Sequence, residues 1–244
     1  MFAPRLALAS LSGESDAAWA RAGAPYAGIA FLGGLALDEP TREAARRMVA
    51  DRDRTEFLPA DPAAFLREQL AALTDVPIDA GCNVRAVGPD PIERTARICA
   101  DHDAVIEVNA HCRQEEMCAV GAGESLLRAP ERLADQVAAA ASTGATVSVK
   151  VRAEVEGVDL AALAARVERA GADAIHVDAM DSESVIADVV HATDAFVIAN
   201  NGVRDEATTR EYLAYGADAV SVGRPSDDPA VLEPVAETVR EWFA

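Results

Sequence analysis

RAGADAIHVD, at residues 169–178, is the stretch that decides the fold. It joins the end of an apolar-faced helix to a glycine, a small residue and a short strand. The same order recurs as AYGADAVSVG at residues 214–223 and as RAGAPYAGIA at residues 21–30. A glycine just past a helix end supplies the left-handed residue that stops the helix, so the chain enters a parallel strand directly. The repeat therefore predicts consecutive strand–helix units.

Eight such units can be traced outward from this repeat. The apolar or β-branched runs that predict strands lie at residues 6–9, 26–32, 78–84, 104–109, 146–152, 174–178, 196–200 and 219–222. Helical patterns separate them, with two, at residues 41–54 and 62–73, in the second connection. Eight units in 244 residues are typical of an α/β protein with one domain, a (β/α)8 TIM barrel over residues 1–244. A doubly wound open sheet is the alternative, but its glycine fingerprint after the first strand is absent.

Composition bounds the class of protein. Hydrophobic residues make up 50% of the chain, which is enough for one large core. No apolar run is long enough to cross a bilayer, and a signal peptide is not indicated, so we expect a cytoplasmic protein with no membrane partner. The four cysteines fit neither a dense disulfide framework nor paired metal-ligand spacing, so no metal site is expected.

The chain is strongly acidic, with 41 Asp and Glu against 22 Lys and Arg and a net charge of −19. Lys150 is the only lysine. An acidic, lysine-poor surface is typical of a halophile-type protein, because high salt screens the self-repulsion. The acidity disfavours tight binding to a phosphate backbone, although this inference weakens where a whole proteome is acidic.

Polar residues follow the fourth and fifth predicted strands. The fourth strand stops abruptly at Asn109 and Cys112, and the carboxyl ends of barrel strands are where ligands bind. Lys150 and Arg152 stand two residues apart on the fifth strand and share a face, which we expect to point into the barrel mouth. A buried ammonium needs either an anionic ligand or an inner acid such as Glu107.

Glycine-containing loops follow the seventh and eighth strands. They carry Asn201-Gly202 and Gly223-Arg224. Barrels commonly hold a phosphate at these two loops through backbone N–H groups, and an arginine adds a charge-assisted pair. Two plain turns are the alternative. At the end of the sixth strand, His176 and Asp178 are expected to face the mouth and contact substrate or cofactor.

The motifs NAHC, GAGESLL, SVKVR, GADAIHVD, ANNGV and SVGRPS, in this order, resemble the dihydrouridine synthase family of FMN-dependent barrels. The resemblance covers nearly the whole chain, and LASLSGESDAAW, with Ser10, is similar to that family's first flavin-binding turn. It implies an FMN-dependent oxidoreductase with hydride transfer between flavin and the C5–C6 bond of a pyrimidine. The substrate would be a uridine in tRNA or a free dihydropyrimidine or dihydroorotate-like molecule, and the external electron donor one such as NADPH.

The resemblance also implies roles for individual residues. Lys150 matches the flavin-contacting lysine, Asn109 the substrate-contacting asparagine, and Cys112 the cysteine that donates a proton to C5 of a uracil. Further cofactor contacts are implied for Ser10, Asn201, Gly202, Gly223 and Arg224, and further substrate contacts for Arg152, His176 and Asp178.

The chain departs from the family pattern in several places. His111 and Arg113 flank Cys112 where the family has glycine and proline, and Arg85, or a position near Asn83, replaces a flavin-contacting glutamine. The strand-six histidine of the family falls at Asp178, and its tRNA-binding helical domain has no counterpart. We therefore expect a barrel-only member, in which flavin chemistry is a firmer expectation than a tRNA substrate.

Two alternatives to this function stay open. One is a flavin-free, phosphate-binding barrel lyase or isomerase, in which Lys150 forms a Schiff base or acts electrostatically. The other is a degenerate barrel with a binding role.

Overall fold

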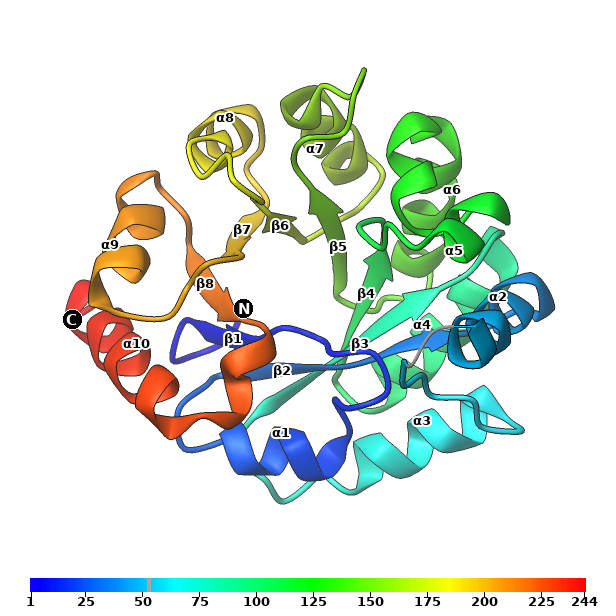
Figure 1. Ribbon diagram of the computed structural model, residues 1–244, viewed down its shortest axis with the longest axis horizontal. Helices are drawn as coiled ribbons and strands as arrows, with labels where there is room; N and C mark the ends of the chain where they lie inside the picture. Colours follow the sequence, from blue (N-terminus) through cyan, green and yellow to red (C-terminus); the bar gives the residue numbers. More distant parts are fainter. Residues whose placement is uncertain (52–53) are drawn as a thin grey trace.

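Eight parallel strands close into a barrel in which each strand pairs with the next along the chain and β1 pairs with β8. In the computed structural model, which describes residues 1–51 and 54–244, helices surround this ring of strands (Figure 1). The strands are β1 (Leu6–Leu8), β2 (Ile29–Ala36), β3 (Asp79–Arg85), β4 (Val105–Asn109), β5 (Val147–Arg152), β6 (Ala174–Asp178), β7 (Phe196–Asn200) and β8 (Ala219–Val222). The predicted (β/α)8 barrel is confirmed.

Each connection between successive strands contains a helix, and that from β2 to β3 contains two, as predicted. The connection from β4 to β5 also contains two α-helices, whereas one was predicted. The helices are α1 (Ala17–Gly23), α2 (Glu39–Asp51), α3 (Pro62–Ala71), α4 (Pro89–Asp101), α5 (Glu115–Ala119), α6 (Pro130–Ala141), α7 (Leu160–Arg169), α8 (Val185–Ala192), α9 (Glu206–Ala214) and α10 (Pro229–Trp242), with short 3-10 helices η1 (Gly123–Arg128) and η2 (Arg224–Asp227). Of the predicted helix 41–54, residues 52–53 lie outside the described residues, and Arg54 lies in the irregular segment before α3.

Aspartates begin many of these helices. The side chains of Asp16, Asp61, Asp159, Asp205 and Asp228 each accept a hydrogen bond from a backbone N–H in the first turn of the helix that follows. These N–H groups have no partner inside the helix, so the carboxylate satisfies them and favours the helix start. Part of the acidity of the chain therefore has a local structural use.

Alternation along the strands gives the barrel a polar interior. On β5, Val147, Val149 and Val151 belong to the main hydrophobic core. Lys150 and Arg152 lie on the opposite face and line a cavity inside the ring of strands. Successive strand residues point to opposite faces, so one strand supplies both the core and the interior. The shared inward face predicted for Lys150 and Arg152 is present.

The amino-terminal end of the barrel is closed by a separate apolar cluster. It consists of Phe2, Ala7, Ile29, Phe31, Val105, Ile198 and Ala219. Ile29, Val105 and Ala219 are the first residues of their strands, so the cluster fills the end opposite the carboxyl ends. This cluster therefore fills the barrel interior at its amino-terminal end.

Strand β2 differs from its prediction. We expected residues 26–32 with an end at Gly33-Gly34, whereas β2 spans Ile29–Ala36 and continues through both glycines, with a register shift between Gly33 and Leu35. A Cβ atom at Gly34 would lie 2.7 Å from Nη2 of Arg85. The glycine leaves room for an arginine of β3 that packs on this backbone, and it does not end the strand.

Candidate active site

A cavity of about 540 Å³ opens at the carboxyl ends of the strands. Most of the site residues predicted from sequence line it: Ser10, Asn109, Cys112, Lys150, Arg152, Asp178, Asn201, Gly202, Gly223 and Arg224. His176 is not among the described lining residues; it is fully buried deeper in the barrel. Its predicted contact with substrate or cofactor therefore has no support from its position.

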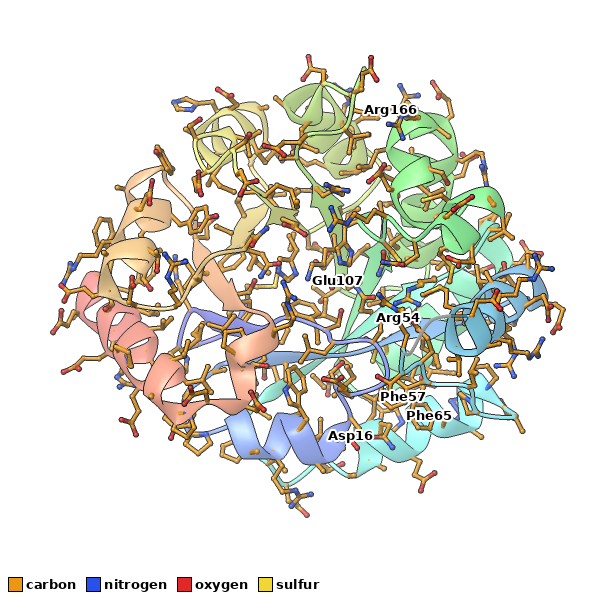
Figure 2. The ribbon with its side chains drawn as sticks, viewed as in Figure 1. Asp16, Arg54, Phe57, Phe65, Glu107 and Arg166 are labelled. Atoms are coloured by element: carbon orange, nitrogen blue, oxygen red, sulfur yellow. The ribbon has the colours of Figure 1, made fainter. Side chains whose placement is uncertain are left out.

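A chain of hydrogen bonds runs through the barrel just beneath the cavity. Asn109 Nδ2 donates to Asn83 Oδ1 over 2.8 Å, and Asn83 Nδ2 donates to Glu107 Oε1 over 2.7 Å. Ser148 Oγ donates to Glu107 Oε2 over 3.1 Å. Glu107 is fully buried inside the barrel (Figure 2). Its carboxylate is thus the centre of an enclosed polar network.

His176 continues this network to β8. Its Nδ1 lies 2.8 Å from Glu107 Oε2 and its Nε2 lies 2.7 Å from Ser221 Oγ. Burial raises the pKa of Glu107, but His176, Lys150 and Asn83 together bring it below its ordinary value, so the carboxylate is ionised. Burial, followed by the charge of Lys150, lowers the pKa of His176. Both ring nitrogens of His176 are therefore occupied by protein groups, Glu107 on one side and Ser221 on the other.

Asn109 links this network to the loop that carries the thiol. Its Oδ1 accepts from the backbone N–H of Cys112 over 3.1 Å and from that of His111 over 3.3 Å. One N–H of its amide is used by Asn83, which leaves the second available at the cavity. Asn109 therefore positions Cys112, in addition to any contact with substrate.

The Cys112 backbone is also held from the other side. Its carbonyl oxygen accepts from the N–H of Glu124 over 2.9 Å, and a Cβ atom at Gly123 would collide with it. The side chain packs in an apolar cluster that includes Met48 and Met117 while it lines the cavity. The glycine-rich turn after α5 therefore serves to seat the thiol.

Lys150 is almost fully buried, with 2% of its surface exposed. Burial lowers the pKa of its ammonium, while Glu107 and Asp178 raise it. The inner salt bridge to Glu107 that was the alternative for Lys150 is not formed among the described residues, because the Glu107 carboxylate binds His176 instead. The lysine is thus available to an anionic or electron-rich ligand.

The β7 and β8 loops form the other side of the cavity. Asn201 has a φ of +89°, and its Nδ2 donates to Asp178 Oδ1 over 2.9 Å. Tyr212 Oη donates to the Asn201 carbonyl over 2.8 Å, which anchors the loop. A Cβ atom at Gly202 or Gly223 would meet nothing within 4 Å, so the backbone there is open to a ligand.

Positive charge concentrates at this cavity. Seven of the 22 basic residues line it: Arg54, Arg85, Arg113, Lys150, Arg152, Arg204 and Arg224. Asp178 is the only acidic residue among the described residues of the lining. In a chain with a net charge of −19, this distribution indicates a site for anions.

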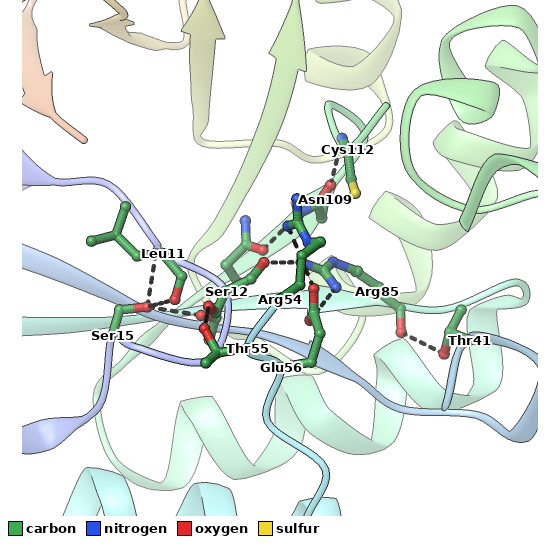
Figure 3. Close-up of polar contacts among 12 residues, drawn as sticks. Leu11, Ser12, Ser15, Thr41, Arg54, Thr55, Glu56, Arg85, Asn109 and Cys112 are labelled. Atoms are coloured by element: carbon green, nitrogen blue, oxygen red, sulfur yellow. Dashed lines mark hydrogen bonds and ion pairs between the residues drawn. The ribbon is translucent and has the colours of Figure 1, made fainter. Parts of the chain in front are cut away.

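Some of these groups were missed or only partly recognised from sequence. Arg85 Nη1 pairs with Glu56 Oε2 at 2.8 Å, and its Nη2 donates to Ser12 Oγ, close to Asn109 and Cys112 (Figure 3). Two-residue spacing from Asn83 on β3 signals that Arg85 points inward. Arg54 and Glu56 carry no such signal, because they come from an irregular segment between two helices.

Among residues 1–51 and 54–244, no cluster of three or more His, Cys, Asp or Glu is arranged to hold a metal ion. In the same part of the chain, none of the helices has the length and apolar character needed to cross a membrane.

Comparisons with known proteins point to one family. The family model described as dihydrouridine synthase matches residues 38–242. An uncharacterized protein of Methanocaldococcus jannaschii is 27% identical, over 90% of this chain and 88% of its own. The tRNA-dihydrouridine synthase B of Proteus vulgaris is 28% identical over 82% of this chain, and this chain spans 65% of its length. A probable tRNA-dihydrouridine synthase of Rhodobacter capsulatus is 27% identical with the same coverage.

Solved structures support the architecture only. FabK from Thermotoga maritima has a TM-score of 0.55 and 18% identity, covering 90% of this chain and 57% of that one. Thiamine phosphate pyrophosphorylase from Pyrococcus furiosus has a TM-score of 0.55 and 12% identity, covering 98% and 97%. At such identities the likeness extends to the barrel and not to its chemistry.

Proposed function

Because the chain belongs to the dihydrouridine synthase family, we propose that it is an oxidoreductase acting on the C5–C6 bond of a pyrimidine, with bound FMN supplying or accepting the hydride. One observation carries the proposal. Cys112, Lys150 and the open loops at Gly202 and Gly223 line a single cavity at the carboxyl end of the barrel. They would supply a proton donor, a buried cation and a phosphate site, which the proposed reaction requires together.

The residues present fit FMN. Its phosphate would lie against the backbone at Gly202 and Gly223, where no Cβ atom obstructs the approach, with Arg224 as counter-charge. Lys150 would face the electron-rich edge of the ring and stabilise negative charge there, since its ammonium is buried and is free of an acidic partner among the described residues. Ser10, after β1, lines the same cavity and would contact the cofactor.

Cys112 would transfer the proton. In the reducing direction the Sγ–H donates to C5, and in the oxidising direction the thiolate accepts the proton from it. Asn109 would hold the thiol in position through the backbone N–H of Cys112, and would present its remaining amide N–H to a carbonyl of the pyrimidine. Arg152 and Asp178 line the cavity and would contact the substrate. The substrate, whether a uridine in tRNA or a free pyrimidine, and an electron donor such as NADPH remain part of this proposal.

The direct test has two stages. First, the native protein is purified and its absorbance spectrum and released cofactor mass are measured, and we expect a flavin band and the mass of FMN. Second, Cys112→Ala is compared with Cys99→Ala, a matched change at a buried cysteine of α4 that does not line the cavity. We expect Cys112→Ala to lower pyrimidine turnover by about 10²–10⁴-fold, while reduction of the flavin by NADPH is unchanged.

Failure would be informative at each stage. A protein that neither carries FMN nor binds it when added would overturn the proposed function. If Cys112→Ala turned over every tested pyrimidine at the wild-type rate, the flavin assignment would stand and the role of the thiol would be wrong.

A further inference from the structure

Three arginines of the cavity each keep an unused hydrogen-bond donor. Nε of Arg54, Arg85 and Arg152 is buried and has no partner among the described residues. All three side chains line the same cavity. A buried guanidinium N–H without an acceptor has lost its hydrogen bond to water without a replacement, so such groups are rare unless a ligand satisfies them.

Acidic side chains hold these guanidinium groups without neutralising them all. Glu56 contacts Arg85 at 2.8 Å and Arg54 at 3.6 Å. Glu124 contacts Arg152 at 2.5 Å and Arg128 at 3.4 Å. Each carboxylate is therefore shared between two arginines, and each group keeps a net positive charge. The acids fix the direction of the guanidinium groups and leave the Nε side free.

His111 shows that several of these cations surround one place. Burial and then Lys150, Arg85, His176 and Arg152 lower the pKa of His111 well below its ordinary value. Cations reduce a neighbouring pKa in this way only at short range. His111 lines the cavity next to Cys112, so the groups that lower its pKa lie around that part of the cavity.

The part of the cavity around Arg85 and Arg152 is distinct from the side assigned to the flavin phosphate. Arg204 and Arg224 follow β7 and β8, whereas Arg85 ends β3 and Arg152 ends β5. Asp178, the acidic residue of the lining, binds Asn201 on the β7 side. The cavity thus has two cationic sides, and a single phosphate accounts for one of them.

We propose that the Cys112 side of the cavity is a second anion site, formed by Arg54, Arg85 and Arg152, which binds an acidic group carried by the pyrimidine itself. The substrate class is then a small acidic pyrimidine, with either a carboxylate on the ring or a monophosphate on the ribose. This inference rests on the proposed function, because the pyrimidine ring must lie beside Cys112. Charge-assisted bonds from several guanidinium groups are what such an anion requires.

A small molecule fits this site better than a polynucleotide. Arg85 and Arg152 are buried, at 3% and 8% exposed, inside a cavity of about 540 Å³. A terminal carboxylate or phosphate can be enclosed there, whereas a phosphodiester is joined to further nucleotides of the RNA on both sides. Outside the cavity acidic residues predominate, which opposes a nucleic-acid backbone.

The test measures affinity for the flavin-loaded protein by calorimetry. The probes are orotate, uridine 5′-monophosphate, the neutral uracil and uridine, and a short uridine-containing RNA. We expect orotate or the monophosphate to bind at least about tenfold more tightly than its neutral counterpart, with the preference reduced in high salt. Which of the two binds more tightly distinguishes a ring carboxylate from a ribose phosphate.

Variants connect this preference to the arginines. Arg54→Gln and Arg152→Gln should each lower the affinity for the anionic probe by about tenfold, and Arg54→Gln should change that for uridine by less than about twofold. Arg166→Gln, at the periphery of the barrel on α7, removes an arginine paired to an exposed glutamate and should change neither affinity. Glu124 keeps Arg128 when Arg152 is replaced, which favours folding of that variant.

Each outcome supports or overturns the inference. Equal affinity for neutral and anionic pyrimidines in a flavin-loaded protein would overturn the second anion site and leave the proposed function standing. Tighter binding of the RNA than of both monomers would overturn the small-molecule class. If no flavin binds, the proposed function fails instead, and binding of orotate to the flavin-free protein still reports on the arginines.

Discussion

The polar network inside the barrel and the arginine-lined mouth above it differ in how their buried polar groups are paired. In the network, Asn83, Glu107, His176 and Ser221 bond to one another, and Asn109 joins them to the Cys112 loop. At the mouth, three arginines keep a buried Nε without a partner among the described residues. Both regions use inward-facing residues of the same barrel.

This difference in pairing distinguishes residues that stabilise the barrel from residues that can bind a ligand. A buried polar group whose partners are all protein groups stabilises one arrangement and presents nothing to a ligand. A buried donor left without an acceptor lowers stability, and a site retains it where a ligand completes it. His176 belongs to the first kind and Arg152 to the second, although strand alternation alone makes the two look equivalent.

The largest effect is expected when the central carboxylate of the buried network is removed. Glu107→Ala leaves Asn83, Ser148 and His176 without an acceptor and leaves Lys150 without a buried counter-charge. We expect the free energy of unfolding to fall by about 3–5 kcal/mol. Urea denaturation measures it, with Glu131→Ala, an exposed partner of Arg166, as the control that changes stability by less than about 1 kcal/mol. Equal losses in the two variants would show that the network is not structural.

A smaller effect is expected at the mouth. Glu56→Gln keeps the shape of a side chain that pairs with Arg85, but removes its charge. We expect a loss of roughly 1–3 kcal/mol in the free energy of unfolding. Added inorganic phosphate should restore part of this loss, because an anion can enter the cavity, and should restore none of the loss in Glu107→Ala. Recovery in both variants, or in neither, would contradict the division into open and closed regions.

The finest test is a pH dependence. The folded-state pKa of His111 lies well below its ordinary value of 6.5. The neutral imidazole is therefore compatible with the folded state above pH 6.5, and the free energy of unfolding falls as the pH drops from 6.5 towards the folded-state pKa, because the unfolded chain binds the proton first. His111→Ala should therefore reduce the slope of unfolding free energy against pH below 6.5 by up to about 1.4 kcal/mol per pH unit. His191→Ala, at an exposed histidine of α8, is the matched control. An unchanged slope in His111→Ala would show that this imidazole is not held neutral by burial and the surrounding cations.

Much of the fold could be predicted because it depends on local patterns. The helix–glycine–strand repeat identified parallel units, and their number indicated the barrel that the structure confirms. The end of β2 could not be predicted, because a pair of glycines such as Gly33 and Gly34 also commonly marks the end of a strand. Their use depends on Arg85, which is about fifty residues away in sequence and packs against Gly34.

The predicted site residues likewise include some that the structure places at the cavity and one that it does not. Lys150 and Arg152 were expected in the mouth from two-residue spacing, and both line the cavity. The same rule placed His176 there, but its two ring nitrogens are bound to Glu107 and Ser221 below the cavity. Period-two alternation gives the side of the sheet on which a residue lies, and it does not give its depth along the barrel axis.

The sequence by itself determined the order of the eight strands, the inward face of β5 and the family to which the chain belongs, because all three are encoded in local spacing and motif order. The tertiary structure alone decided which inward groups have partners. It brought Glu56 and Arg54 from a segment between two helices to the barrel mouth, and it enclosed His176 beneath the cavity. Contacts between distant segments depend on closure of the whole barrel, and no stretch of the chain carries that information.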